Sequence, residues 1–205
     1  PNHVWNSLDN KNFLRSLGGY AVNRGTKEEG LTLAGLLMFG KGLSIRERLE
    51  NFRFDFLDMT NLFGDRRWSD RLTYDGTWEN NIYNFIKIVL PKLVSDLKRP
   101  FVLEGFQRKD DTVVHASIRE AMMNSIIHCD YHQAGILKII KKNNEFIFSN
   151  PGRLKISIEE IYEGGNSVAR NPKIQTMLRM IGYGENIGSG FPMILKTWKA
   201  ENWRK

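Results

Sequence analysis

Residues 115–132, HASIREAMMNSIIHCDYH, decide how the rest of this sequence is interpreted. Read at 100° per residue, small and apolar side chains in this stretch fall on one stripe, with the spacing of a helix packed on a core. Glu120, Asn124 and His128 recur every four residues on a different face. The sequence therefore predicts a helix with one buried and one polar face. The predicted buried stripe comprises Ile118, Ala121, Met122, Ser125 and Ile126.

The polar face of this helix carries two groups that suit phosphate chemistry. Glu120 and Asn124 lie one helical turn apart, so their oxygen atoms can act together. An amide oxygen can ligate magnesium, and a carboxylate can accept a proton from an adjacent water. The same pattern is typical of an ordinary amphipathic helix with a solvated polar face. The surrounding sequence has to decide between these two interpretations.

Composition places the chain among ordinary globular proteins. It has 205 residues, of which 41% are apolar and 26% charged, enough for one large or two small domains. Lys and Arg exceed Asp and Glu by 30 to 23, which gives a net charge of +7. A polyanionic partner such as nucleic acid or nucleotide phosphate is compatible with this excess, although the basic residues are spread along the chain.

Cysteine content and hydropathy narrow the cellular setting. The single cysteine, Cys129, excludes an internal disulfide and a multi-cysteine zinc site, and it fits the reducing cytoplasm. No stretch approaches the roughly 20 apolar residues of a membrane span, so we expect no membrane partner. The chain begins at Pro1 and stops in a basic helical stretch, so we expect it to be a piece of a larger protein.

The N-terminal half shows helix and strand signals in alternation. Residues 9–18 and 32–39 predict helices, and the period-two alternation of residues 52–57 predicts a strand. Residues 35–42 nearly match a phosphate-binding P-loop, but Gly42 stands where Ser or Thr must bind magnesium, so that interpretation is rejected. A short strand is expected at 72–74, and a long helix at 78–97 that Pro91 should kink or break.

The C-terminal half contains a hairpin followed by helix caps. Strand material is expected at 101–106 and 112–114 around a turn at 108–111, followed by strands at 136–140 and 145–149 that flank an Asn-Asn turn. Ser157 and Glu160 form a capping-box pattern, and Asn171 precedes Pro172 as the cap of another helix. A last helix is expected at 192–198, opened by a glycine-rich turn.

Two glycine-containing turns lie downstream of the key helix. The turn Gly188-Ser189-Gly190 at a helix start would present free backbone N–H groups to phosphate. Gly152, just past a strand, would let the backbone approach a flat ring such as a nucleotide base. Each turn alone is a weak signal, but the ordered set of helix and two turns is more specific.

Four segments carry a resemblance to a known family. These are 119–131 (REAMMNSIIHCDY), 149–154 (SNPGRL), 170–172 (RNP) and 185–191 (ENIGSGF). With them, residues 100–198 resemble the divergent GHKL (Bergerat-fold) ATPase domain of Schlafen AlbA-type transcriptional regulators, often labelled RecG-like. Residues 11–99, which include LTLAGLLMFG at 31–40, resemble the segment that joins the AlbA-type domain to the ATPase domain in such proteins.

The resemblance implies a fold and a division of the chain. The fold class is α/β (α+β), a layered sandwich of helices on a mixed β-sheet of the GHKL/Bergerat type. Residues 1–76 would form an N-terminal α/β connecting segment packed on the ATPase-like domain. Residues 77–205 would form the ATP-binding domain, with a lid over the nucleotide at about 153–187.

The resemblance also implies roles for individual residues, with ATP and Mg²⁺ as cofactors. Glu120 would be the general base that activates the attacking water, and Asn124 the magnesium ligand. Asn150 and Gly152 would contact the adenine. The phosphates would be held by Gly188, Ser189 and Gly190. Asn150 departs from the wider superfamily, which usually has Asp there; an amide oxygen can accept the adenine hydrogen bond, but without the charge.

The implied function is an ATP-binding, slowly hydrolysing module of a DNA-linked transcriptional regulator. We expect DNA contacts to come through domains outside this chain, and a homo-oligomer is left open. The alternative is a nucleotide-independent module for nucleic acid or protein, with a vestigial pocket. Its contacts would be Arg66, Arg67 and Arg71 with Trp68, and Lys196, Lys199, Arg204 and Lys205 with Trp198 and Trp203.

Two further alternatives concern the end of the key helix. His128, Asp130 and His132 could be imagined as a metal site, but their spacing shares one face only on a strand, whereas this stretch ends a helix. A nucleophilic pair of Cys129 and His128 is disfavoured because adjacent helical residues point apart.

Overall fold

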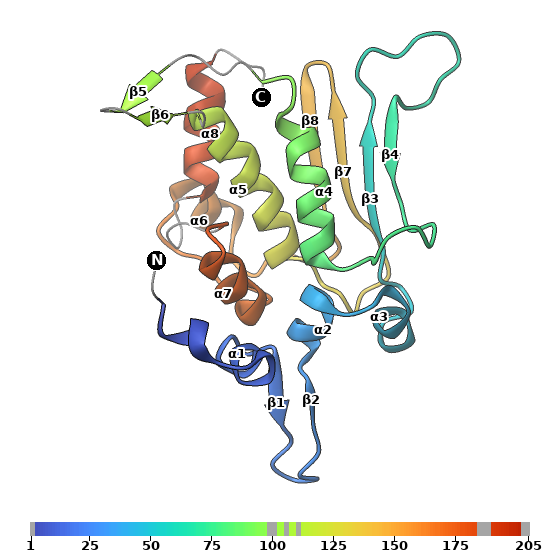
Figure 1. The fold of residues 1–205 in the computed structure, drawn as a ribbon. Helices are drawn as coiled ribbons and strands as arrows, with labels where there is room; N and C mark the ends of the chain where they lie inside the picture. Colours follow the sequence, from blue (N-terminus) through green and yellow to red (C-terminus); the bar gives the residue numbers. More distant parts are fainter. Residues whose placement is uncertain (1–2, 98–101, 105–106, 110–111, 184–189, 202–205) are drawn as a thin grey trace.

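The computed structural model describes residues 3–97, 102–104, 107–109, 112–183 and 190–201. Its centre is a four-stranded mixed sheet in the order β4-β3-β7-β8 (Figure 1). Strands β3 and β7 are parallel, and each pairs with its outer neighbour in antiparallel fashion. The strands are β3 (Phe54–Asp58), β4 (Asp70–Leu72), β7 (Leu137–Lys142) and β8 (Glu145–Ser149).

Helices cover one face of this sheet. Figure 1 shows α4 (Ile82–Val94) and α5 (Val113–Ile127) lying along the sheet, with α8 (Gly190–Ala200) on the far side of α5. The Ser117 hydroxyl on α5 donates to the Thr197 hydroxyl on α8 over 2.9 Å, which joins the two helices. The shorter helices α6 (Ile158–Glu163) and α7 (Pro172–Met180) lie between β8 and α8 in the chain. The predicted sandwich of helices on a mixed sheet is confirmed.

The remaining elements are short. The chain opens with a 3-10 helix, then α1, the hairpin β1–β2, and helices α2 and α3. A second two-stranded hairpin, β5–β6, lies between α4 and α5 in the order of the chain. Their bounds are η1 Val4–Ser7, α1 Asn10–Ser16, β1 Tyr20–Val22, β2 Glu29–Leu31, α2 Leu33–Phe39, α3 Gly42–Arg48, β5 Val102–Glu104 and β6 Gln107–Lys109. Within the described ranges, every helix is too short or too polar to cross a bilayer.

The predicted apolar stripe of α5 is the centre of the core. Ile118, Met122 and Ile126 are fully buried, and Ser125 is nearly so. They face the sheet side chains that point to the helices, Phe54 and Phe56 on β3 and Leu137 and Ile139 on β7, all of which are buried. Ala121, the remaining member of the predicted stripe, is only partly buried and borders the cavity, and the four buried members fix the orientation of α5 about its own axis.

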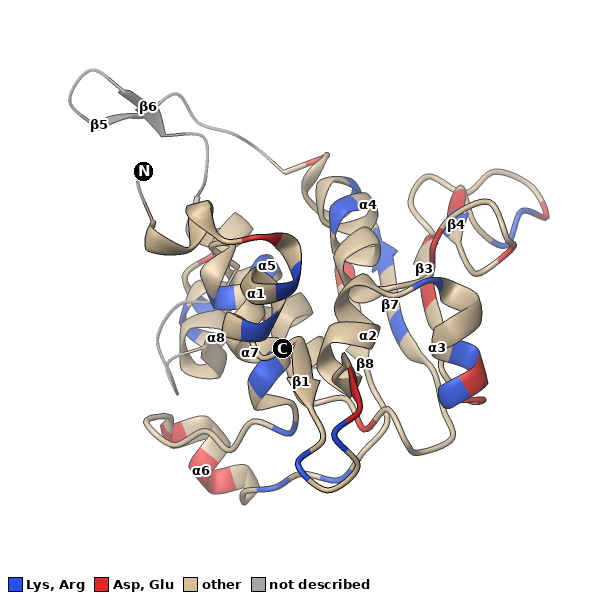
Figure 2. Cartoon of the chain, turned by 60° about the horizontal axis from the view of Figure 1, so that its bottom comes forward, with Lys and Arg blue, Asp and Glu red and all other residues tan. Residues whose placement is uncertain are grey.

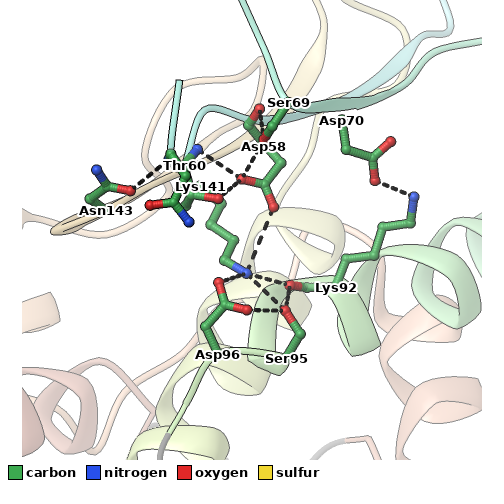
Figure 3. Close-up of polar contacts among 10 residues, drawn as sticks. Asp58, Thr60, Ser69, Asp70, Lys92, Ser95, Asp96, Lys141 and Asn143 are labelled. Carbon is green, nitrogen blue, oxygen red and sulfur yellow. Dashed lines mark hydrogen bonds and ion pairs between the residues drawn. The ribbon is translucent and has the colours of Figure 1, made fainter. Parts of the chain in front are cut away.

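A buried lysine ties the end of α4 to the sheet (Figure 3). Lys141 on β7 is 3% exposed, and its ammonium group lies 2.7 Å from Asp96 and 3.7 Å from Asp58 on β3. It also donates to the Lys92 carbonyl at 2.8 Å and to the Ser95 hydroxyl at 3.0 Å. Its hydrogen bond and the one from Ser95 lower the pKa of Asp96. Replacing lysine here would leave the surrounding oxygens without their cation.

The sheet includes strands from both sides of the predicted domain boundary. Strands β3 and β4 precede residue 76, and β7 and β8 follow it, yet β3 pairs directly with β7. The domain boundary at residue 76 therefore stays a prediction, and the central sheet contains strands from both sides of it.

Two expectations from the sequence are wrong. Thr112–Val114 form no strand; Thr112 caps α5 and accepts a hydrogen bond from the His115 N–H, and the valines enter the first helical turn. Arg108 and Lys109, expected in a turn at 108–111, belong to β6. Pro91 also fails to break α4, because it lies in an exposed part of the last turn, where water can solvate the Lys87 carbonyl that loses its partner.

Candidate functional site

A cavity of about 940 Å³ lies between α5 and the segment that follows β8. We call α5 and residues 148–152 the floor, and residues 153–169 the flap. Both line the cavity, together with Arg170, parts of α7 and the start of α8. Three features that the sequence suggested in order, the polar face of α5, residues 150–152 and Gly190, thus border one space.

The polar face of α5 forms one wall of this cavity. Glu120, Asn124 and His128 are partly buried and all line it. The Asn124 amide nitrogen donates to the Glu120 carboxylate over 3.2 Å. This bond orients the amide, so that its oxygen is the atom of Asn124 left to bind a cation. The predicted pairing of an acid with an amide is therefore present in the fold.

Glu120 lies against the first residue of α8. A Cβ atom added at Gly190 would stand 2.0 Å from a Glu120 carboxylate oxygen, so a side chain there would require the Glu120 carboxylate to move. The carboxylate therefore lies at the N-terminal end of α8, where the helix dipole favours negative charge. Gly190 thus touches the carboxylate as well as the cavity. Gly188 and Ser189, predicted with it, lie outside the described residues.

Residues 150–152 leave the end of β8 and line the cavity. Asn150 is partly buried, and its amide nitrogen donates to the Pro151 carbonyl at 3.3 Å. Gly152 has a φ of +119°, a conformation that disfavours any side chain. An added Cβ would also lie 3.1 Å from Asp130 Cβ and 3.3 Å from the Arg170 guanidinium. The glycine is therefore needed for packing against Asp130 and Arg170, a reason that the sequence pattern did not contain.

Arg170 contacts the chain on both sides of the cavity. Its Nε donates to the His128 carbonyl at 3.1 Å, and one terminal nitrogen lies 3.4 Å from the Asp130 carboxylate. The other terminal nitrogen donates to the Arg153 carbonyl at 2.6 Å. One guanidinium thus joins the end of α5 to the first residue of the flap.

Asn171 is bound next to it, in a manner that the sequence did not predict. It precedes α7, but its side chain makes no capping hydrogen bond to that helix. Instead its amide nitrogen donates to the carbonyls of Ile127 at 3.0 Å and Cys129 at 2.7 Å. The last residues of α5 have carbonyls without helical partners, and Asn171 satisfies them. Asn171 therefore occupies the predicted cap position of α7, but its side chain binds the end of α5 instead of α7.

The cavity lining carries an excess of positive charge. Among the described residues, Arg153, Lys155, Arg170 and Arg179 line it, against the single carboxylate of Glu120. Burial lowers the pKa of His128, and the positive charges of Arg170 and Lys155 lower it further. Neutral His128 adds no charge near pH 7, so the field in the cavity favours an anionic ligand.

The alternatives at the end of α5 lose their support. Asp130 is engaged by Arg170 and by the His132 N–H, and within the described ranges no three His, Cys, Asp or Glu side chains group as a metal site. Burial, and then the charge of Asp130, raise the pKa of Cys129 to about 12. A thiol with that pKa stays protonated and unreactive near neutral pH.

Sequence reasoning missed the cationic side of the cavity. Lys155 and Arg179 were not singled out, and Arg153 and Arg170 were quoted only as parts of motifs. A signal existed in the RNP stretch at 170–172, where an arginine precedes an Asn-Pro helix start. Its partners are 17 to 42 residues away, and no local pattern identifies contacts at that range.

Comparisons with known proteins agree with an ATPase-like fold. Residues 137–205 match a family described as "Putative ATP-dependent DNA helicase recG C-terminal", which supports an ATPase-like domain from β7 onward. Residues 1–55 match DUF8451, a domain of unknown function. Among curated proteins, none matches the chain.

One similar solved structure is that of the DIP2311 protein from Corynebacterium diphtheriae. It superimposes with a TM-score of 0.60 at 21% identity, over 91% of this chain and 35% of that one. The chain therefore spans about a third of the length of DIP2311. At this identity the likeness extends to the fold alone.

Proposed function

We propose that this chain binds ATP with Mg²⁺ in the cavity between floor and flap, and hydrolyses it slowly. The observation that carries the proposal is the convergence of Glu120, Asn124, Asn150 and Gly152 on one space of about 940 Å³. That volume is at the upper end of the roughly 300–1,000 Å³ usual for small-molecule sites. The match of residues 137–205 to an ATPase-related family supports the same conclusion.

The charges around the cavity suit a triphosphate. Four cationic side chains line it, three of them, Arg153, Lys155 and Arg170, at the flap and its base, and Arg179 on α7. Arginine and lysine form charge-assisted hydrogen bonds to phosphate oxygens. Asn150 and Gly152, at the end of β8, would contact the base, with the Asn150 amide oxygen as acceptor for the adenine amino group. Gly188, Ser189 and Gly190 would hold phosphates.

The residues present fit a magnesium ion bound together with the nucleotide. Asn124 would contribute its amide oxygen, and the remaining ligands would be waters and phosphate oxygens, as Mg²⁺ prefers. When bound, the ion would neutralise charge on the phosphates. The hydrogen bond from Asn124 to Glu120 keeps the ligand and the base one turn apart on the same rigid helix.

Glu120 would act as the general base. Its carboxylate would accept a proton from a water that attacks the terminal phosphorus, and the bond from that phosphorus to the bridging oxygen would break. The N-terminal end of α8 favours the ionised form of this carboxylate, because the helix dipole is positive there.

The proposal also covers how the chain is divided into units and what kind of protein it belongs to. Residues 77–205 would form the nucleotide-binding unit, with 153–187 as its lid and 1–76 as the connecting segment that supplies β3 and β4 to the sheet. The chain would be a module of a DNA-linked transcriptional regulator in the cytoplasm, with DNA contacts made by other domains. Oligomerisation is left to measurement.

The test combines binding and turnover on two variants. Wild-type protein is titrated with ATP, with and without Mg²⁺, by calorimetry, and phosphate release is measured. Glu120→Gln should keep binding and lower turnover by about 10²–10⁴-fold. Asn124→Ala should abolish the difference between titrations with and without Mg²⁺. Absence of ATP binding by the folded wild-type protein would refute the proposal.

A nucleic-acid-binding module is the second candidate function. On the loop between β3 and β4, Phe63 is 77% exposed and Trp68 40%, and the Arg71 guanidinium lies 5.1 Å from the Trp68 ring centroid. Exposed aromatics beside arginine are typical of single-strand binding. Figure 2 shows Lys and Arg interleaved with Asp and Glu on this loop, which weakens the attraction to a polyanion. Salt-sensitive binding of labelled DNA, unaffected by ATP, would favour this candidate.

A further inference from the structure

The flap has no fully buried apolar side chain, and Ala169 at its end is only partly buried where it packs against the core. None of residues 153–169, all of which the structure describes, is buried. The ring of Tyr162 on α6 meets that of Phe191 on α8 edge-on, with centroids 5.3 Å apart. Several apolar side chains of the flap, including Leu154, Ile158 and Tyr162, are more than half exposed. Burial of apolar area therefore contributes little to holding the flap over the cavity.

Polar contacts at the two ends of the flap take that role. Arg170 follows the last flap residue and donates to the carbonyl of the first, Arg153, at 2.6 Å. The Lys155 ammonium lies 3.5 Å from the Ala169 carbonyl, across the same gap. The flap is thus a loop closed at its base, and Arg170 is the side chain that closes it.

The same guanidinium fixes the closed base to the floor. Its remaining contacts go to the His128 carbonyl and the Asp130 carboxylate, both just past the end of α5. It also packs against Gly152, where an added Cβ would lie 3.3 Å from two of its nitrogens. The Asp130 N–H in turn donates to the Pro151 carbonyl at 2.8 Å. One side chain therefore contacts α5, the 150–152 turn and the flap.

We infer that Arg170 is a positioning residue that latches the flap to the floor, and so sets the shape of the base-binding end of the cavity. This inference rests on the proposed nucleotide site for its effect on ligand affinity. The latch itself is a property of the protein without ligand. Lysine cannot reproduce these contacts, because three different nitrogens of the planar guanidinium make them and lysine has a single nitrogen.

The latch is tested first without nucleotide, by hydrogen exchange of the full chain followed by mass spectrometry. In Arg170→Lys and Arg170→Ala, peptides covering 150–169 should exchange about tenfold faster or more, since charge-assisted hydrogen bonds are lost. Peptides covering β7 and β8 should stay within about twofold of wild type. Arg179→Ala is the matched control, because it removes a cavity arginine outside the latch, and should leave exchange in 150–169 unchanged.

Nucleotide titration then separates the effect of the Arg170 contacts from the effect of its positive charge. Arg170→Lys keeps the charge but should weaken ATP binding about tenfold, whereas Arg24→Lys, at an exposed position outside the cavity lining, should bind like wild type. If Arg170→Ala fails to fold, Asp130→Asn removes one latch partner and should speed exchange in the same peptides. Wild-type exchange rates in 150–169 of both Arg170→Lys and Asp130→Asn would overturn the latch. Loss of ATP binding in wild type would instead overturn the proposed function, and leave the exchange result standing.

Discussion

The two walls of the cavity are held in place by different forces. The floor helix α5 has nine buried residues, among them Ile118, Met122 and Ile126, which are fully inaccessible. The flap helix α6 has none. It keeps its shape through local polar contacts, such as the capping box in which Ser157 and Glu160 exchange hydrogen bonds. Apolar burial thus orders the floor, and hydrogen bonds order the flap.

This difference suits a site that must hold chemistry still while a ligand enters. The groups proposed for catalysis, Glu120 and Asn124, are on the rigid wall. The flap, which lies within the proposed lid, is attached through the polar contacts of Arg170 at one end of the cavity and through the edge-on contact of Tyr162 with Phe191. Opening it would break a few polar contacts and expose little apolar surface, so the free energy of opening is small compared with that of global unfolding.

The largest loss of stability should come from removing a buried side chain from the floor. Met122→Ala removes a fully buried side chain from α5 and should lower the free energy of unfolding by about 2–5 kcal/mol. Ile158→Ala on the flap, where the side chain is 56% exposed, should change it by less than about 0.5 kcal/mol. Urea denaturation of both variants measures the contrast. Equal destabilisation would mean that the flap belongs to the same packed core as α5.

A smaller effect is expected where the flap's end is attached. Asn171→Ala removes both side-chain hydrogen bonds to the Ile127 and Cys129 carbonyls, which should cost about 1–3 kcal/mol. The matched control is Asn166→Ala in the flap, whose amide donates only to exposed Glu160 and should matter by less than about 0.5 kcal/mol. Thermal melts of the two variants give the comparison. An Asn171→Ala variant that melts at the wild-type temperature would contradict the role of this residue as a tie between α7 and α5.

The smallest effect should appear as a pH dependence at the junction of the two walls. Burial, Arg170 and Lys155 lower the pKa of His128 below its ordinary value of 6.5. The unfolded chain therefore binds a proton at higher pH than the folded one, and stability present above pH 6.5 falls as the pH drops through the folded pKa. His128→Gln should flatten this decline between about pH 7 and about pH 5. Urea denaturation over that range measures it, and an unchanged slope would refute the assignment.

Periodic patterns predicted the framework correctly because they reflect local chemistry. The i, i+4 spacing of Glu120 and Asn124 places them together on any helix, and the structure has them 3.2 Å apart. The hairpin at 137–149 and the capping box at Ser157 were predicted for the same reason. Each signal requires only neighbours within a few residues.

Predictions failed where a partner was distant. Asn171 has the sequence of a helix cap, yet it binds carbonyls more than forty residues earlier in the chain. Thr112–Val114 have β-branched side chains, yet tertiary packing and the Thr112 cap make them start a helix. For Gly152 the contact with a base stays a prediction, and the sequence did not indicate that Asp130 and Arg170 also leave no room for a side chain there.

The sequence by itself determined which side chains share a helix face and which glycines open turns, because these follow from the fixed repeat of the backbone. It also determined a net charge of +7, which is compatible with an anionic partner. Only the tertiary structure decided that α5, the 150–152 turn and the flap enclose one cavity, and that Arg170 joins them. Those facts depend on contacts between segments far apart in the chain, which form only when the apolar core brings them together.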